Sequence, residues 1–139
     1  MPMKLSTLLA ALCLTASTAI AQVSFTNFGR PCGGTLTGSL GPRTGTIAMD
    51  VSNAAPGAAC VLVIGPLMRP QPLPNSLCDL LVDPRITLVG TIDAQGNASF
   101  RMPLPGVTPL TVDFQAVIVG ITRRGRMAES TNRVEMQSR

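Results

Sequence analysis

The chain of 139 residues contains no histidine, tryptophan or tyrosine, and its only lysine is Lys4. Histidine is the commonest general base and metal ligand, so its absence excludes the nucleophile arrangements that depend on it. Tryptophan and tyrosine supply the usual stacking surfaces for sugars and single-stranded nucleic acids. The composition therefore predicts no catalytic residue, no cofactor, no metal site and no nucleic-acid partner.

The first 21 residues have the pattern of a secretory signal-peptide helix. Lys4 precedes an apolar run that starts at Leu8, and the small residues Ala19 and Ala21 form a cleavage motif. The run is shorter than a membrane-spanning segment and hydroxyl residues interrupt it, so we expect cleavage after Ala21 and no membrane span afterwards. A lipoprotein signal at Cys13 is disfavoured, because a leucine precedes it. We expect a secreted, periplasmic or cell-envelope protein.

Residues 22–139 are expected to form one domain, and they carry ten arginines against seven acidic residues, a net charge of +3. Most of the arginines are dispersed, but Arg123, Arg124 and Arg126 form a cluster. This cluster is a possible surface contact for an acidic envelope or extracellular protein, polymer or lipid headgroup. We favour a solvated turn between two strands, because no aromatic residue stands beside the three guanidinium groups.

Short apolar or alternating segments separated by glycine and proline dominate the rest of the chain. Gly65 to Asn75 contains four prolines and is predicted to be an extended surface loop. The clearest expected strands are residues 46–52, 59–64, 77–82, 86–92, 98–102, 111–122 and 132–136. Such a series predicts an all-β fold, an antiparallel β-sandwich of about seven or eight short strands, with a small closed barrel as the alternative.

The clearest reversal signal lies between Leu77 and Leu104. Asp93 and Gly96 have the spacing of a short loop in which the glycine adopts a positive φ. The sequence therefore predicts a β-hairpin between residues 86–92 and 98–102. In the longest expected strand, residues 117–121 are apolar on both faces, which predicts that this end is covered.

Several carboxylates could in principle carry chemistry. Asp79 and Asp83 are spaced to leave the same face of one strand, where they could bind calcium or act as an acid and base pair. Asp93 and Asn97 resemble part of a calcium loop. We favour solvent-facing and turn-capping roles for all four residues, because the intervening positions lack further acidic ligands.

The order and spacing of several short motifs resemble a family of uncharacterised bacterial secreted domains, often found at the C-terminal end of larger extracellular proteins. The resemblance covers Phe28 to Glu135 and implies an all-β extracellular domain without a recognised active site. This chain departs from it in Cys60 and in the Arg123–Arg126 cluster. The motifs are Phe28-Gly with Cys32-Gly, Pro42 with Gly45, Asn53-Ala-Ala-Pro, a run ending at Gly65, Pro72-Leu-Pro74, Cys78-Asp-Leu-Leu-Val-Asp-Pro84, Asp93-Ala-Gln-Gly96, Phe114-Gln115 and Ser130-Thr-Asn132.

Three cysteines follow the predicted cleavage point, an odd number for an oxidising compartment. The resemblance includes Cys32 and Cys78 and so implies a disulfide between them, with Cys60 as a buried thiol. The chain-entropy model gives about 4 kcal/mol for that pair and about 3 kcal/mol for Cys60 with Cys78, which does not decide between them. The second pairing stays open, because its cysteines fall on consecutive expected strands.

Two classes of function remain. The favoured one is a non-catalytic secreted or cell-envelope β-domain with a binding or structural role. The alternative is an extracellular hydrolase that uses carboxylates such as Asp79, Asp83 or Asp113, and it requires at least two of them to converge in a cleft. A carrier with an apolar cavity inside a barrel is a third possibility.

Overall fold

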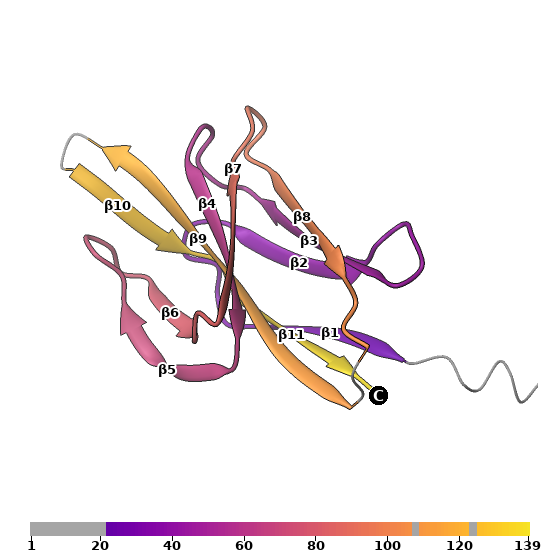
Figure 1. Ribbon diagram of the computed structural model, residues 1–139. Helices are drawn as coiled ribbons and strands as arrows, with labels where there is room; N and C mark the ends of the chain where they lie inside the picture. Colours follow the sequence, from indigo (N-terminus) through magenta and orange to yellow (C-terminus); the bar gives the residue numbers. More distant parts are fainter. Residues whose placement is uncertain (1–21, 107–108, 123–124) are drawn as a thin grey trace, which may run out of the picture.

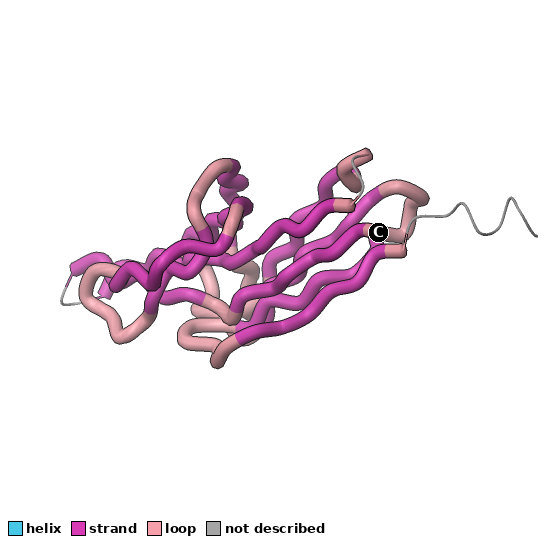
Figure 2. The backbone as a smooth tube through the Cα atoms, turned by 90° about the horizontal axis from the view of Figure 1, so that it is seen from below, coloured by secondary structure: helices cyan, strands magenta, loops and turns pink. Residues whose placement is uncertain are grey.

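The computed structural model describes residues 22–106, 109–122 and 125–139, and every regular element in these ranges is a β-strand (Figure 1). Figure 2 shows the same arrangement without any helix in the described part. The strands are β1 (Val23–Phe28), β2 (Thr35–Leu40), β3 (Thr46–Ser52), β4 (Ala59–Gly65), β5 (Leu67–Pro72), β6 (Asp79–Val82), β7 (Ile86–Thr91), β8 (Ala98–Pro103), β9 (Leu110–Thr122), β10 (Gly125–Ser130) and β11 (Arg133–Ser138). The predicted antiparallel β-sandwich is confirmed, although the sequence suggests seven or eight strands and the described chain has eleven. The predicted signal peptide lies outside the described residues.

The long strand β9 is the centre of the larger sheet. That sheet has six strands in the order β1-β11-β9-β4-β7, with β10 also paired to β9. One edge of β9 pairs with β4, and the other pairs with β11 through residues 110–114 and with β10 through residues 117–122. A three-stranded sheet, β2-β3-β8, packs on one face, and β5 and β6 form a separate ribbon. In Figure 1, β9 and β10 extend beyond the smaller sheet as a two-stranded arm.

The hydrophobic core lies between the two sheets and follows the alternation of the strands. Phe114, Ala116 and Ile118 of β9 point into it, whereas Leu36 and Met49 reach it from β2 and β3. All five side chains are almost fully buried. Complete burial of a large apolar side chain contributes about 1.5–3 kcal/mol, so this alternating face of β9 is a main source of stability.

The predicted turn after β7 forms, but the strands that it joins do not pair. Asp93 Oδ1 accepts the backbone N–H groups of Gln95 at 3.0 Å and Asn97 at 2.9 Å, and Gly96 has a φ of 85°. However, β7 pairs with β4 in the larger sheet, and β8 pairs with β3 in the smaller one. The hairpin prediction is therefore wrong, and this segment is an arch that crosses from one sheet to the other.

A second arch, residues 53–58 between β3 and β4, crosses between the sheets beside the first. The Ala54 N–H donates to the Gly96 carbonyl at 3.1 Å, and the Gly57 N–H donates to the Ile92 carbonyl at 2.9 Å. A Cβ added to Gly96 would lie 2.8 Å from the Ala54 carbonyl oxygen, so both the positive φ and the close approach require glycine here. The paired arches fix the spacing of the two sheets at this end.

The proline-rich segment contains a strand where the sequence predicts a loop. β5 pairs with β6 at Leu67, Gln71 and Pro72, and the register is irregular between Leu67 and Gln71. Proline is excluded from central strands but tolerated on a strand with one partner and a broken register. The loop prediction is therefore wrong, because proline is excluded only from strands that are paired on both edges.

Candidate functional site

A disulfide joins Cys32, in the β1–β2 connection, to Cys78, directly before β6, with Cα atoms 5.7 Å apart. The pairing implied by the resemblance is confirmed, and the alternative pairing with Cys60 is wrong. Ser130, at the end of β10, binds both segments: its carbonyl accepts the Cys32 N–H at 3.0 Å, and its hydroxyl donates to the Asp79 carbonyl at 2.9 Å. The β5–β6 ribbon is thus attached to the sandwich both covalently and by hydrogen bonds.

Gln115, on the outer face of β9, is a buried side chain that holds β6 against the larger sheet. Its Oε1 accepts the Leu81 N–H at 2.7 Å, and its Nε2 donates to the carbonyls of Asp79 at 3.1 Å and Thr131 at 3.0 Å. The amide therefore has three partners on two segments of the chain, β6 and the connection between β10 and β11. These contacts identify Gln115 as a structural residue, because its donors and acceptor are all used within the fold.

Asn132 makes the equivalent connection to the smaller sheet. The Leu36 N–H donates to Asn132 Oδ1 at 2.8 Å, and Asn132 Nδ2 donates to the Leu36 carbonyl at 3.0 Å. The neighbouring Thr131 hydroxyl oxygen accepts the Ala116 N–H at 3.0 Å. Buried polar groups are costly unless they are hydrogen-bonded, and here each bond also joins the connection between β10 and β11 to a strand.

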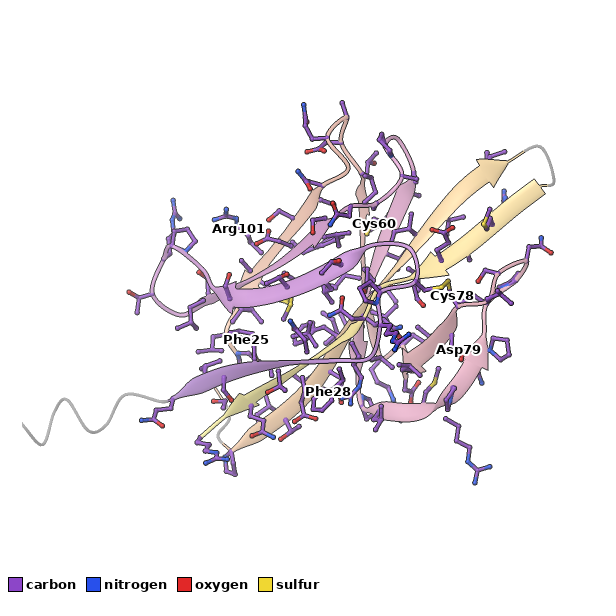
Figure 3. All side chains as sticks on the ribbon, turned by 180° about the vertical axis from the view of Figure 1, so that it is seen from behind. Phe25, Phe28, Cys60, Cys78, Asp79 and Arg101 are labelled. Carbon is purple, nitrogen blue, oxygen red and sulfur yellow. A yellow bond between two sulfur atoms is a disulfide. The ribbon has the colours of Figure 1, made fainter. Side chains whose placement is uncertain are left out.

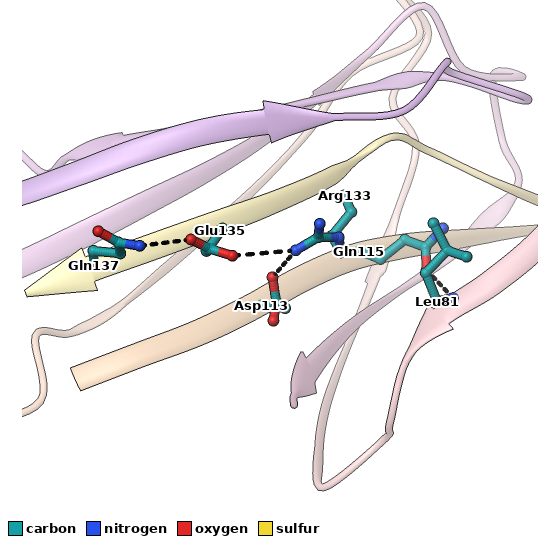
Figure 4. A network of polar contacts seen from close by, with 6 residues as sticks. All are labelled: Leu81, Asp113, Gln115, Arg133, Glu135 and Gln137. Carbon is teal, nitrogen blue, oxygen red and sulfur yellow. Dashed lines mark hydrogen bonds and ion pairs between the residues drawn. The ribbon is translucent and has the colours of Figure 1, made fainter. Parts of the chain in front are cut away.

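Arg133 is the centre of a polar network on the outer face of β9 and β11 (Figure 4). Its guanidinium forms a buried ion pair with Asp113 and a longer contact of 3.5 Å with Glu135, which in turn accepts a bond from Gln137 at 2.8 Å. The guanidinium carbon also lies 4.3 Å from the centre of the Phe28 ring. This cation–π contact covers the arginine and links β1 to the network.

A recess of about 310 Å³ opens beside the disulfide. Phe28, Arg30, Leu77 and Asp79 stand at its rim, and the buried polar residues described above form its floor. Leu77 is fully exposed. Figure 3 places Cys78 and Asp79 together near β6, and places Arg101 away from them on the smaller sheet. The recess is therefore a hollow with a polar floor and a rim of two apolar and two charged side chains, built around the attachment of β6.

The carboxylates of the hydrolase alternative each have a separate environment. Asp83 pairs with Arg85 through Oδ2 and Nε at 2.9 Å, and Asp113 is paired with Arg133. Asp79 is exposed and is the only acidic side chain among the described residues that line the recess. The structure thus gives Asp83 and Asp113 structural partners and leaves Asp79 without a second carboxylate at that recess.

A pair that the sequence does not single out, Asp50 and Asp93, lines a different recess of about 310 Å³ at the edge of the smaller sheet. Asp50 accepts the Ser99 hydroxyl at 2.7 Å, and Asp93 caps its own turn. The calcium-like pattern of Asp93 and Asn97 is therefore turn chemistry. Within the described parts of the chain, no three histidine, cysteine or acidic side chains group together in a way that could hold a metal ion.

The structure describes only one residue of the arginine cluster. Arg123 and Arg124 lie outside the described residues. Arg126 is exposed on β10 opposite Ile121 of β9. Gly125–Ser130 lacks a clear apolar alternation, so the sequence does not indicate β10, whose pairing with β9 extends the larger sheet.

Beside Arg126, the outer face of the larger sheet is apolar. In register, Val61 of β4 lies between Val89 of β7 and Val117 of β9, so three valines form a row across adjacent strands. Val89 is 78% exposed, and Ile121, farther along β9, is 87% exposed. The prediction that residues 117–121 are covered is confirmed only in part, because Ile118 is buried and Val117 and Val119 are half-buried, whereas Ile121 is exposed. On the outer face, β6 covers the sheet at Val63 and Gln115. We call residues 61, 89, 117, 119 and 121 the valine face.

A groove of about 690 Å³ borders the valine face. One wall is the arch of residues 55–58, and the other is formed by Val119, Gly120, Ile121 and Arg126. The groove is lined mainly by small apolar side chains, and its one charged member is Arg126. An uncovered apolar surface with a basic rim is typical of a site that contacts another macromolecule.

Cys60 is fully buried in the core, where it lies opposite Ile118 and Gly90 in the register. Burial raises the pKa of its thiol from about 9.0 to about 11. A thiol rather than a thiolate is therefore present at neutral pH, and the side chain acts as a small core residue.

No family model, curated protein or solved structure matches this chain. In the described ranges there is also no helix long and apolar enough to cross a membrane. The function must therefore be argued from the residues and geometry of this chain.

Proposed function

We propose that this protein is an exported, non-catalytic β-domain that binds another protein through the valine face. The observation that carries the proposal is the valine row, in which Val89 is exposed and the other two valines are half-buried, with exposed Ile121 beside it and next to a groove. Burial of such side chains in a complex contributes favourable free energy. A partner with an apolar centre and an acidic rim would complement Arg126.

The buried polar groups support the same proposal. Gln115 and Asn132 have their hydrogen bonds within the fold, and Asp113 has an ion pair. These residues stabilise the sandwich. The Cys32–Cys78 disulfide supports an oxidising compartment, which agrees with the export expected from the first 21 residues.

We also propose that the chain belongs with the uncharacterised bacterial secreted domains that its motifs resemble. Several of the shared motif residues stand at joints of the fold, which supports a common architecture. They include the disulfide cysteines, Gly96 at the stacked arches, and Gln115 and Asn132 between strands.

A site-specific photocrosslinker tests the proposed binding face. Placed at Ile121 in the exported protein, it should give a discrete cross-linked partner in the native envelope or culture medium, whereas Thr37 on exposed β2 should not. The purified partner should then bind the Ile121→Asp variant at least about tenfold more weakly than the Thr37→Asp control. Equal crosslinking at both positions, or unchanged affinity in Ile121→Asp, contradicts the proposal. A hydrolytic activity that Asp79→Asn abolishes would instead favour the carboxylate hydrolase.

A further inference from the structure

The strand β7 forms one border of the larger sheet. It pairs with β4, and no other strand among the described residues pairs with its second edge. Its inner face is occupied, because the Phe100 ring packs so closely beneath Gly90 that an added Cβ would lie 3.1 Å from it. Thr87, Val89 and Thr91 are exposed on the outer face. In Figure 1, β7 is next to β4.

The hydrogen bonds of this ladder show which backbone groups point to the open edge. The Ile92 N–H donates to the Ala58 carbonyl at 2.9 Å, in phase with the β4–β7 register. Since antiparallel strands alternate their bonding direction, the even-numbered residues of β7 bond to β4. The N–H and C=O groups of Thr87, Val89 and Thr91 therefore face outward.

These outward groups are arranged symmetrically about Val89. We propose that two copies of this chain associate by antiparallel pairing of their β7 strands, with Val89 at the two-fold axis. Val89 then pairs with Val89 of the second copy, and Thr87 pairs with Thr91 twice. Each such pair exchanges two bonds, so the edge gains about six hydrogen bonds. The outer faces remain on the same side, and the two valine rows become continuous.

Charge complementarity favours this register. Arg85 and Asp93 lie just outside β7, each four residues from Val89 on opposite sides. The pairing therefore brings Arg85 of one copy, which also forms an ion pair with its own Asp83, toward Asp93 of the second copy. The Arg85 and Asp93 side chains are exposed. A shift that centres the pairing on Leu88 would instead place Asp83 opposite Asp93, which is repulsive, and would use fewer of the outward groups.

The composition of β7 agrees with a paired edge. Exposed edge strands usually carry a charge or a proline that blocks pairing with another chain. Residues 86–91, reading ITLVGT, contain neither, and Ile86 is 57% exposed in addition to Val89. The border strands β1 and β2 also lack a charge and a proline, whereas β8 includes Arg101 and Pro103. The feature that distinguishes β7 is Val89, an apolar side chain that is 78% exposed in the middle of the strand. A second copy supplies the uncharged, extended partner that this edge requires.

Sedimentation of the purified exported protein tests the proposal. We expect a concentration-dependent dimer, and Val89→Lys should raise its dissociation constant at least about tenfold, because two ammonium groups would meet at the axis. Thr26→Lys, at an exposed position on the border strand β1, should leave the dimer unchanged. A monomer at all concentrations, or equal behaviour of the two variants, overturns the proposal.

Cysteine crosslinking tests the register and does not depend on the lysine variants. In the folded protein, Cys60 is buried and the other two described cysteines form the disulfide, so an introduced thiol reacts selectively. A short bis-maleimide should join Val89→Cys chains to each other, and should join Thr87→Cys chains to Thr91→Cys chains. Thr87→Cys chains should not join each other, because those residues are about 13 Å apart along the paired strands. Equal crosslinking of Thr87→Cys with itself overturns the register. This inference stands independently of the partner proposed for the valine face.

Discussion

Alkaline pH should destabilise this protein through one side chain. Residues 22–139 contain no lysine, tyrosine or histidine, and Cys32 and Cys78 are bonded to each other. Cys60 is therefore the only side chain in this part whose ordinary pKa lies between about 8 and 11. Burial raises that pKa from about 9.0 in its ordinary environment to about 11 in the folded protein.

The direction of this pH effect follows from the difference in the Cys60 pKa between the folded and the unfolded chain. As pH rises above 9, the Cys60 thiol ionises in the unfolded chain while the folded chain retains the proton, so deprotonation favours unfolding. The stabilising contribution is complete below pH 9 and is lost as pH approaches 11. The two pKa values give a loss of about 2 kcal/mol in the free energy of unfolding between pH 8 and 10.5.

Urea denaturation followed by circular dichroism measures this loss, since the chain has no tryptophan for fluorescence. Cys60→Ala is the matched control: it should be less stable at every pH but should show almost none of the dependence between pH 8 and 10.5. Equal slopes in the two proteins would refute the reasoning, because the dependence would then come from another source. A pH-independent wild type would also refute it.

Three further predictions concern the stability of the sandwich and use the same denaturation assay. Replacing Cys32 and Cys78 together by alanine should lower the free energy of unfolding by about 4 kcal/mol, because the unfolded chain loses a 46-residue crosslink; a loss below about 1 kcal/mol contradicts this. Arg133→Met should cost about 3–5 kcal/mol by leaving the buried Asp113 carboxylate unpaired, and adding Asp113→Leu should recover part of the loss; no recovery would argue against the ion pair as the cause. Ser138→Ala should raise stability by about 1 kcal/mol, because the buried Ser138 hydroxyl has no hydrogen-bond partner among the described residues; a loss of stability would show that the hydroxyl is bonded.

Local patterns were enough to predict the strands that form the core. The alternation of Val112, Phe114, Ala116 and Ile118 predicts one buried face of β9, and the structure confirms it. The same holds for Thr46–Ser52, whose apolar positions face inward. Burial alternates from one residue to the next along a strand, so a short stretch of sequence is enough to predict the strand and its buried face.

The pairing of strands depends on distant residues and was predicted less well. The Asp93–Asn97 turn has the same local chemistry whether its flanking strands pair with each other or diverge into two sheets. The outcome depends on β4, which pairs with β7, and on β3, which pairs with β8. The centre of the larger sheet is β9, which pairs with three other strands.

The sequence predicts the candidate site only in part, because a run of apolar residues on both faces of a strand is also the pattern of a buried core strand. Residues 117–121 are apolar on both faces, and coverage on both sides is the usual explanation of such a run. In the structure the outer side is covered only in part at this end, because the β5–β6 ribbon lies over the sheet at Gln115 and Val63, whereas Ile121 is exposed. The local sequence of β9 does not predict how far the β5–β6 ribbon, which is distant in the chain, extends across the sheet.

The attachment of β6 to the larger sheet therefore determines both the position of the β5–β6 ribbon and the extent of the valine face. The disulfide and the bonds of Ser130 and Gln115 hold β6 over one part of the sheet, so that Val63 is buried. Two residues away on β4, Val61 is half-buried and belongs to the valine row that ends at exposed Val89. The buried polar residues thus determine where the apolar surface begins. The paired carboxylates have roles in stabilising the fold, but the exposure of this apolar surface does not stabilise the fold and so indicates a binding role.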